Sequence, residues 1–547
     1  MKLKRTFLGP VLVALVAFIS GGWLLQHQVA VANGVDERIF NEILSRVARD
    51  YVDEHSQEEL YQMAVDGLLY ELGDPHTSFM SREAYEDLRV QTTGEYGGLG
   101  IQIAERGGWI TVIAPLPGTP AERAGLRAGD RIIEVEGKST EGWSDEDAVK
   151  VLRGPKGSPV SIRIARPGVD EPIPFTIVRD EIRVKSVQYA YMLQPGIGIA
   201  RLNVFAETST SELQRAIEDL RSQGMKGLIL DLRTNPGGLL DQGVQVADLF
   251  LEPGQTIVET RGRDPRDNET FTAAKPDLLP GIPMVVLVDE YSASAAEIVA
   301  GALQDHDRAL VIGSPTFGKG SVQTLFPLSG GNFLKMTTGR WYTPVGRSIQ
   351  KERRSREQEE LTALLEEEAI SEEGHPVPAG EAVDTAMRRP YRTDSGRIVY
   401  GGGGIVPDLL VKPDTLTERE REFFSTIAKG GSKFNDAIFR YAVDYVREHP
   451  ELQRGFDVTD AMFEEFYQRL TESGLEVPHE QYVDADRWVR QRLGYEIALA
   501  KWGSAVASQR SNADDRVVRT AVDLLRQANS QQALFELVEQ RQQQAAR

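Results

Sequence analysis

The 547-residue sequence contains no cysteine, and this absence excludes several kinds of site. Without thiols the chain can form no disulfide bond, no thiolate metal site and no cysteine nucleophile. The absence of cysteine does not show in which cellular compartment the protein works. Basic residues are outnumbered, because 62 Lys and Arg stand against 82 Asp and Glu and give a formal net charge of -20. This balance argues against nucleic acid as a partner.

The start of the chain carries an apolar run over residues 7–25. Lys2, Lys4 and Arg5 precede it, and Ala30-Val31-Ala32 follows it as a small-x-small cleavage site. This order is typical of a secretory signal peptide. A run of about 19 residues is also near the length that spans a bilayer, so an uncleaved N-terminal membrane anchor is the alternative. In either case we expect residues 1–32 to direct the chain out of the cytoplasm, to the periplasm or to the outer face of the cytoplasmic membrane.

The length predicts several domains, because single cores rarely exceed about 300 residues. Residues 33–92 carry apolar side chains at helical spacing and predict an N-terminal helical region. Residues 181–414 alternate strand and helix patterns and predict an α/β core with largely parallel pairing. An acidic insertion at 351–392 interrupts this core, and residues 415–547 predict a C-terminal helical region that could brace the core or join copies of the chain. The strands expected in the core are 197–204, 227–230, 284–288, 310–312, 323–328 and 333–338.

Residues 93–180 have a different pattern, in which short stretches of alternating apolar and polar residues predict strands. They begin with Gly98-Leu99-Gly100-Ile101, where successive backbone N–H groups could form a nest for an anion. The alternative is a plain glycine hairpin. The expected strands are 110–113, 131–135, 158–164 and 175–178.

The first candidate catalytic residue is Ser294, which begins a helical pattern and is surrounded by small residues. An ordinary helix N-cap is the alternative interpretation of this serine. Lys319 lies 25 residues further on, between Gly318 and Gly320, in a segment of turn and strand character. A helix followed by a returning strand could bring Lys319 beside Ser294, where a neutral lysine would take the serine proton.

A second candidate is the turn Asn235-Pro236-Gly237-Gly238, which follows a predicted strand and precedes a helix. Free backbone N–H groups at such a helix start suit a developing oxyanion. Taken alone, the pattern is better explained by an ordinary strand-to-helix turn.

Together these stretches resemble the carboxyl-terminal processing proteases, or tail-specific proteases, a serine peptidase family with a Ser–Lys pair. The resemblance spans about residues 35–414 and implies a crotonase-like core with an inserted PDZ domain at 93–180. It implies that Ser294 is the nucleophile, Lys319 the general base and Gln323 the residue that orients the lysine. The amides of Ala295 and of Gly237 or Gly238 would form the oxyanion hole, with Gly237 favoured. Glu297 matches an acidic position of the family, whereas Ala296 replaces a serine that many members carry.

The resemblance also implies that Gly98, Leu99, Gly100 and Ile101 bind the C-terminal carboxylate of a protein or peptide substrate. Arg153 is placed to couple the PDZ domain to the protease core, with a solvated loop arginine as the alternative. The expected function is a serine endopeptidase that cleaves extracytoplasmic proteins near the C-terminus, without cofactor or metal.

Two other functions were weighed against this one. A noncatalytic PDZ scaffold on a protease-like fold has no physical need for Ser294, Lys319 and the glycine turn together. A Ser-His-Asp protease would need a histidine near the serine. His306 is expected about 15–18 Å away along the same helix, which is too far for a base.

Overall fold

The structure is a computed structural model that describes residues 37–351, 388–412, 414 and 416–545. The expected signal or anchor segment and most of the expected insertion at 351–392 lie outside these residues. Within the described ranges, no helix combines the length and apolar character that crossing a membrane requires. The chain divides into two compact units, one of Met1–Tyr85 with Gln323–Thr337 and one of Glu86–Val322 with Thr338–Arg547.

The smaller unit combines helices with a short piece of antiparallel sheet. A helix covers residues 37–50, and α2 (Gln57–Leu72) begins at a capping box in which Ser56 bonds the Glu59 amide. Strand β1 (Ser78–Met80) pairs with the first residues of β18 (Phe333–Tyr342), which also pairs with β17 (Ser321–Pro327). The predicted N-terminal helical region is therefore present.

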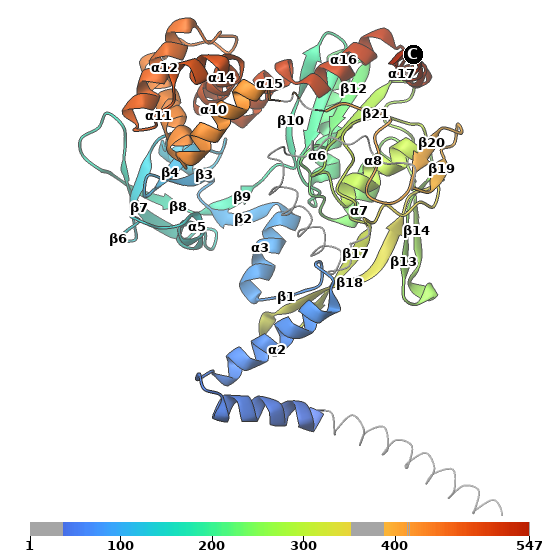
Figure 1. Ribbon diagram of the computed structural model, residues 1–547, viewed down its shortest axis with the longest axis horizontal. Coiled ribbons are helices and arrows are strands. Elements are labelled where there is room, and N and C mark those ends of the chain that lie inside the picture. The colour runs from blue at the N-terminus through green and yellow to red at the C-terminus, as the bar shows by residue number, and fades with distance from the viewer. Residues whose placement is uncertain (1–36, 352–387, 413, 415, 546–547) are drawn as a thin grey trace, which may run out of the picture. The chain divides into compact units, whose positions relative to one another are not determined.

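In the larger unit, an antiparallel sheet with two short helices occupies the region predicted as a PDZ domain (Figure 1). It lies between β2 (Glu95–Gly98) and β9 (Asp180–Arg183), which pair with each other. The two ends of the inserted domain therefore lie side by side, as an insertion into another domain requires. Its other elements are β3 (Ile101–Arg106), β4 (Trp109–Pro115), α4 (Pro120–Ala124), β5 (Arg131–Val135), β6 (Lys138–Ser139), α5 (Asp145–Leu152), β7 (Pro159–Ala165) and β8 (Ile173–Val178).

The core of the larger unit is a six-stranded sheet in the order β10-β11-β12-β15-β16-β21. Only the β10–β11 pair is antiparallel within this order, and the four following pairs are parallel. Buried strands such as β12 and β15 are continuous apolar runs, because helices cover both faces of a parallel sheet. The strands are β10 (Val187–Gln194), β11 (Ile197–Leu202), β12 (Gly227–Asp231), β15 (Met284–Val288), β16 (Leu310–Gly313) and β21 (Leu409–Leu410).

Two sets of helices cover this sheet. On one face, Leu228, Leu230 and Val286 pack against α6 (Ser209–Ser222), α7 (Leu240–Asp248) and α8 (Ala295–Asp305). On the other, Ile229 and Val285 pack against α16 (Arg516–Gln527) and α17 (Gln531–Ala545). The end of the C-terminal region is thus the second helical layer of the core. The remaining strands are β13 (Thr256–Gly262), β14 (Glu269–Thr272), β19 (Pro390–Arg392) and β20 (Ile398–Tyr400).

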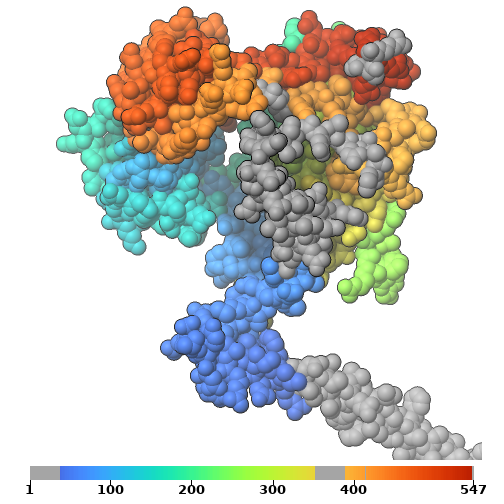
Figure 2. All heavy atoms as spheres, in the orientation of Figure 1, coloured from blue at the N-terminus to red at the C-terminus, as the bar shows by residue number. Residues whose placement is uncertain are grey.

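The rest of the C-terminal region is a helical domain with its own aromatic core, in which Phe423, Phe434, Phe466 and Tyr482 are buried. Figure 2 shows this domain (orange) packed against the PDZ region (cyan). The predicted mixed α/β fold with N- and C-terminal helical regions is therefore confirmed. The helices of this region are α10 (Glu418–Lys429), α11 (Lys433–Glu448), α12 (Asp460–Glu472), α13 (His479–Asp484), α14 (Asp486–Trp502) and α15 (Ser504–Asp514).

Candidate active site

The candidate site is built from the loops that follow three neighbouring parallel strands, β12, β15 and β16. Because the strands are parallel, their carboxyl ends meet at one edge of the sheet, where ligands commonly bind. The Ala293 amide donates to the Asn235 carbonyl at 2.9 Å, and the Phe317 amide donates to the Ser292 carbonyl at 3.0 Å. These bonds bring the serine, glycine-turn and lysine motifs together, although they lie in separate parts of the sequence.

Ser294 precedes α8 in a conformation that an ordinary N-cap does not adopt. Its φ and ψ are 56° and -115°, whereas the capping residue Ser56 of α2 has the usual extended values of -67° and 155°. Positive φ in a residue with a Cβ typically costs about 1–3 kcal/mol and persists only where the surroundings enforce it. This strain at the predicted nucleophile favours a functional role over simple capping.

The Glu297 side chain connects the serine to the lysine loop. Its Oε2 accepts hydrogen bonds from the Ser294 amide at 2.8 Å and the Lys319 amide at 2.9 Å. Its Oε1 accepts from the Gly318 amide at 2.7 Å and from the Thr316 hydroxyl at 2.5 Å. One carboxylate therefore fixes the backbone of both predicted catalytic residues.

Glu297 is fully buried, and burial raises the pKa of its carboxyl group, while the bonds from Thr316 and the backbone amides oppose that rise. The Thr316 hydroxyl itself accepts from the Ile405 amide at 2.7 Å, so its proton is directed to Glu297. Four donors thus occupy the acceptor positions of the two carboxylate oxygens. These bonds stabilise the ionised form and offset part of the cost of burying it.

The loop that carries Lys319 is fixed on both sides of that residue. The Trp341 indole donates to the Lys319 carbonyl at 3.1 Å, and the Gly320 amide donates to the Gln350 side chain at 2.9 Å. Gly318 has φ 89°, and a Cβ there would lie 3.0 Å from the Gly404 amide nitrogen. The lack of a Cβ at Gly318 therefore allows the lysine loop to pass close to the Gly404 backbone.

The glycine turn lies directly against the serine. Asn235 holds it, because its side chain donates to the Leu202 carbonyl at 2.7 Å and accepts from the Gly237 amide at 2.8 Å. A Cβ on Gly237, whose φ is 93°, would lie 2.8 Å from the Ser294 Cβ. Within the described residues, the amides of Gly238 and Ala295 have no hydrogen-bond acceptor.

A network that the sequence did not reveal supports this turn from the C-terminal region. Arg233 bonds the fully buried Asp231 at 2.8 Å and reaches Asp515 at 2.7 Å. Asp515 also caps α16, because its other carboxylate oxygen accepts from the Val517 and Val518 amides. The sequence does predict the cap, because an Asp directly before a helical pattern is typical of a helix N-cap. No sequence signal shows that it meets an arginine 282 residues away.

A second contact from α15 lies close to this network. The Asn512 amide donates to the hydroxyls of Tyr189 and Tyr191, both at 2.9 Å. Burial raises the pKa of Tyr191 to about 12 and raises that of Tyr189 further, so both remain neutral hydrogen-bonding groups. The C-terminal region therefore contacts both the sheet and the loop that leads to the glycine turn.

The predicted carboxylate loop of the PDZ region has the expected open amides. The Leu99 and Gly100 carbonyls accept from the Ala121 and Leu116 amides, both at 2.9 Å, which orients the loop. The amides of Leu99 and Gly100 have no acceptor among the described residues. Gly100 has φ 75°, and a Cβ there would lie 2.4 Å from the Thr119 side chain. Ile101 follows as the first residue of β3.

The remaining predicted residues lie as follows. Gln323 belongs to the smaller unit, where its side-chain amide donates to the Thr337 hydroxyl at 3.4 Å, and its link to Lys319 stays a prediction. Arg153 contacts Asp87 of α3 (Arg82–Thr93) at 3.2 Å and lies over the Tyr96 ring. His306 ends α8 at the far end from Ser294, bonded to Asp394. Among the described residues, no group of three or more His, Cys, Asp or Glu could hold a metal.

Comparison with known proteins gives matches to three family models. Residues 196–356 match peptidase family S41, and residues 111–166 match the PDZ domain. Residues 434–484 match the C-terminal helical domain of probable PDZ-proteases. Along the chain the PDZ match comes first, the peptidase match second and the helical-domain match last, and they fall in the inserted domain, the core and the C-terminal helices.

Similar whole proteins agree with these matches. A carboxy-terminal-processing protease of Bartonella bacilliformis is 47% identical over 315 residues, which cover 57% of this chain and 72% of that protein. The carboxy-terminal processing protease CtpA of Bacillus subtilis is 36% identical over 340 residues, covering 62% and 72%. Among solved structures, the photosystem II D1 C-terminal processing protease is 33% identical, with a TM-score of 0.33 and coverage of 56% and 82%. The chain therefore belongs to peptidase family S41, as a serine-type carboxy-terminal-processing protease with a PDZ domain.

Proposed function

We propose that this protease is a Ser–Lys endopeptidase that selects protein substrates by their free C-terminus. The observation that carries the proposal is the Glu297 carboxylate, which bonds the amides of both Ser294 and Lys319. A structural helix start needs no such link to a loop 22 residues away. A nucleophile and its base do need a fixed mutual geometry.

In the proposed mechanism the Ser294 hydroxyl attacks the scissile carbonyl while a neutral Lys319 amine accepts its proton. The new C–O bond converts the carbonyl to an oxyanion. Collapse of this oxyanion breaks the C–N bond, the protonated lysine gives its proton to the leaving amine, and the acyl group stays on Ser294. Water repeats the sequence on the acyl-enzyme and releases the acid. Lysine must be neutral for the first step, and since its ordinary pKa is about 10.4, cleavage should rise with pH.

The oxyanion is proposed to accept hydrogen bonds from the Gly238 and Ala295 amides, which have no other acceptor among the described residues. The start of α8 adds the positive end of a helix dipole. Gly237, which the sequence favoured as a donor, has its amide bonded to Asn235. We therefore assign it a different role, in which the lack of a Cβ allows the turn to approach Ser294.

Substrate choice is proposed to depend on the open amides of Leu99 and Gly100, with Gly98 and Ile101 at the ends of the loop. A C-terminal carboxylate would accept hydrogen bonds there, and the last residues of the substrate would add as a strand beside β3. The apolar run after Lys2, Lys4 and Arg5 supports substrates outside the cytoplasm, reached by secretion or by an N-terminal anchor.

The experiment compares one peptide as its free acid and as its C-terminal amide, with cleavage followed by mass spectrometry. Hydrogen bonds to a charged group contribute about 1.5–3 kcal/mol each, so below saturation the amide should be cut about 10- to 100-fold more slowly. The S294A variant should cut neither form. Equal rates for acid and amide would remove C-terminal recognition, and cleavage by S294A would remove the nucleophile.

A further inference from the structure

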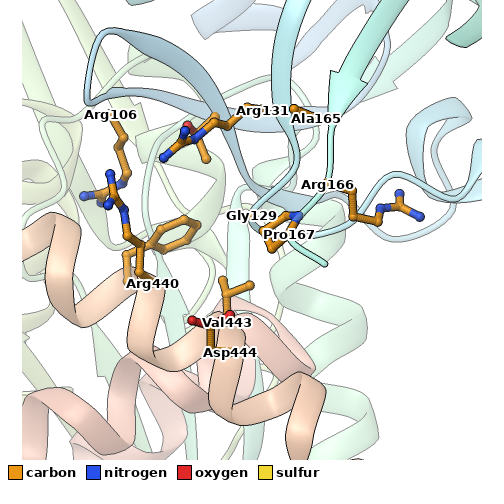
Figure 3. A pocket seen from close by; sticks show the side chains of 11 residues that line it. Arg106, Gly129, Arg131, Ala165, Arg166, Pro167, Arg440, Val443 and Asp444 are labelled. Carbon is orange, nitrogen blue, oxygen red and sulfur yellow. The ribbon is translucent and has the colours of Figure 1, made fainter. Parts of the chain in front are cut away.

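A pocket of about 360 Å³ lies where the PDZ domain packs against α11, away from the candidate active site. The PDZ side contributes β3, β5 and the turn after β7, and the other side is one face of α11. Figure 3 shows the two walls and the side chains between them. The lining residues are Arg106, Thr111, Gly129, Arg131, Ala165, Arg166, Pro167, Phe439, Arg440, Val443 and Asp444.

The two domains are in close contact around this pocket. Arg106 bonds Asp436 of α11 at 2.9 Å and lies over the Phe439 ring at 4.8 Å. A Cβ on Gly129 would lie 2.7 Å from the Val443 side chain. The pocket is therefore a half-open cleft at a packed interface, and a ligand within it would touch both domains.

The charge of the lining is opposite to that of the whole chain. Four arginines face one aspartate in a protein of net charge -20. Three of these charges have partners close by, because Arg106 bonds Asp436, Arg166 bonds Asp130 at 2.7 Å, and Asp444 bonds Arg447 at 3.0 Å.

Arg131 and Arg440 are the remaining two charges, and neither has a hydrogen-bond or ion-pair partner in the part of the chain that the structure describes. Arg131 is half-buried on the PDZ side, whereas Arg440 of α11 is exposed at the mouth of the pocket. Burial and the nearby Arg440 charge both lower the pKa of Arg131, and Asp436 only partly opposes this. In Figure 3 the guanidinium groups of Arg106, Arg131 and Arg440 lie toward the same side of the pocket, and that of Arg166 points away.

We propose that this pocket binds a small oxyanion, a phosphate or carboxylate group, between Arg131 and Arg440, and that the anion joins the PDZ domain to the C-terminal helical domain. Guanidinium groups bind both kinds of oxyanion through paired N–H donors. Without an anion the two arginines repel each other across the interface, whereas a bridging anion turns the same pair into an attraction. Binding to the docked arrangement would stabilise it by mass action.

The test measures binding of inorganic phosphate and of citrate to the full chain by calorimetry and thermal unfolding, with chloride keeping the ionic strength constant. The wild type should bind at least one of the two saturably, at one site per chain, with a raised melting temperature. R131Q and R440Q should each weaken that binding about tenfold or more. R454Q, which removes an exposed arginine of the helical domain outside the pocket, should bind like the wild type.

A charge reversal makes the test independent of simple loss of folding. R440E places a carboxylate opposite Arg131 but also one helical turn from Asp436 and Asp444, so its effects on the melting temperature oppose each other. Its diagnostic result is loss of the response to phosphate and citrate in a variant that stays folded. Preference for phosphate or for citrate would identify the group that the pocket takes. Absence of saturable binding of both anions to the wild type, or an undiminished response in R131Q and R440Q, would overturn the proposal.

Discussion

Replacing Glu297 by glutamine tests the link between the serine and the lysine loop with little change in side-chain volume. The carboxylate accepts from two donors at each oxygen, and an amide keeps only one oxygen. Of the two orientations of the glutamine side chain, the less costly one turns its NH2 group toward Thr316 and Gly318. The Thr316 hydroxyl can then reverse and accept, but the Gly318 amide loses its acceptor.

The magnitude follows from these bonds. An unpaired buried amide costs about 1–3 kcal/mol, and each bond to Ser294 and Lys319 loses about 1 kcal/mol when its acceptor becomes neutral. Relief from burying a charge offsets part of this sum, because burial is the factor that raises the pKa of Glu297. We expect the free energy of unfolding to fall by about 2–4 kcal/mol and kcat to fall about tenfold or more, since 1.36 kcal/mol is tenfold in rate.

The pH dependence separates positioning from general destabilisation. Since the pKa of Glu297 is raised, its ionised fraction falls at a higher pH than that of an exposed glutamate. Wild-type cleavage should therefore decline more steeply as the pH is lowered through that pKa, and E297Q should keep only the decline that protonation of Lys319 produces. The assay is kcat and KM for a short peptide across the acid range, with thermal unfolding of each variant. E252Q, at an exposed glutamate, is the control. A wild-type kcat and an unchanged acid limb in E297Q would refute the reasoning.

Two further substitutions test the supports of the glycine turn. D515N keeps an N-cap for α16, because Asn caps as well as Asp, but it removes the charge that Arg233 meets at 2.7 Å. Its melting temperature should stay within a few degrees of wild type while kcat falls about tenfold, and an unchanged kcat would show that this ion pair does not position the turn. G237A would place a Cβ 2.8 Å from that of Ser294 at φ 93°, so peptide cleavage should be lost. G254A has nearly the same φ of 90° and meets no atom within 4 Å, so it is the matched control, and similar activities of the two variants would contradict the steric argument.

Much of the fold could be predicted from local patterns in the sequence. Strand 284–288 has the predicted bounds, because it is a continuous run of buried β-branched and aliphatic residues. Strand 131–135 also has the predicted bounds, although it is only partly buried and carries two charged residues. Strand β18 runs to Tyr342, beyond the expected end at 338. Its last residues pair with β13, and that long-range pairing leaves no local signal. The domain boundaries drawn from the sequence stay predictions.

The candidate active site was only partly predictable, because its long-range contacts also leave no local signal in the sequence. Ser294, Lys319 and the glycine turn lie in short motifs that together indicate their chemistry, although each alone has an ordinary structural interpretation. The resemblance marked Glu297 as an acidic position, but its bond to the lysine loop could not be predicted from the sequence. The bond between Asp515 and Arg233 could not be predicted either, because both contacts form only after folding. The packing of α16 and α17 on the sheet could not be predicted for the same reason. Their apolar faces predict that the helices are buried, but not which surface they pack against.

The proposed Ser–Lys mechanism is tested most directly by locating the acyl group on the enzyme. The full chain is mixed with a peptide ester, quenched in acid within the first turnover, digested and mapped by mass spectrometry. The mechanism predicts the acyl mass on Ser294 and none in the K319R variant, because a guanidinium stays charged and cannot accept the serine proton. An acyl group on another residue such as Ser292, or acylation of K319R at the wild-type rate, would contradict it.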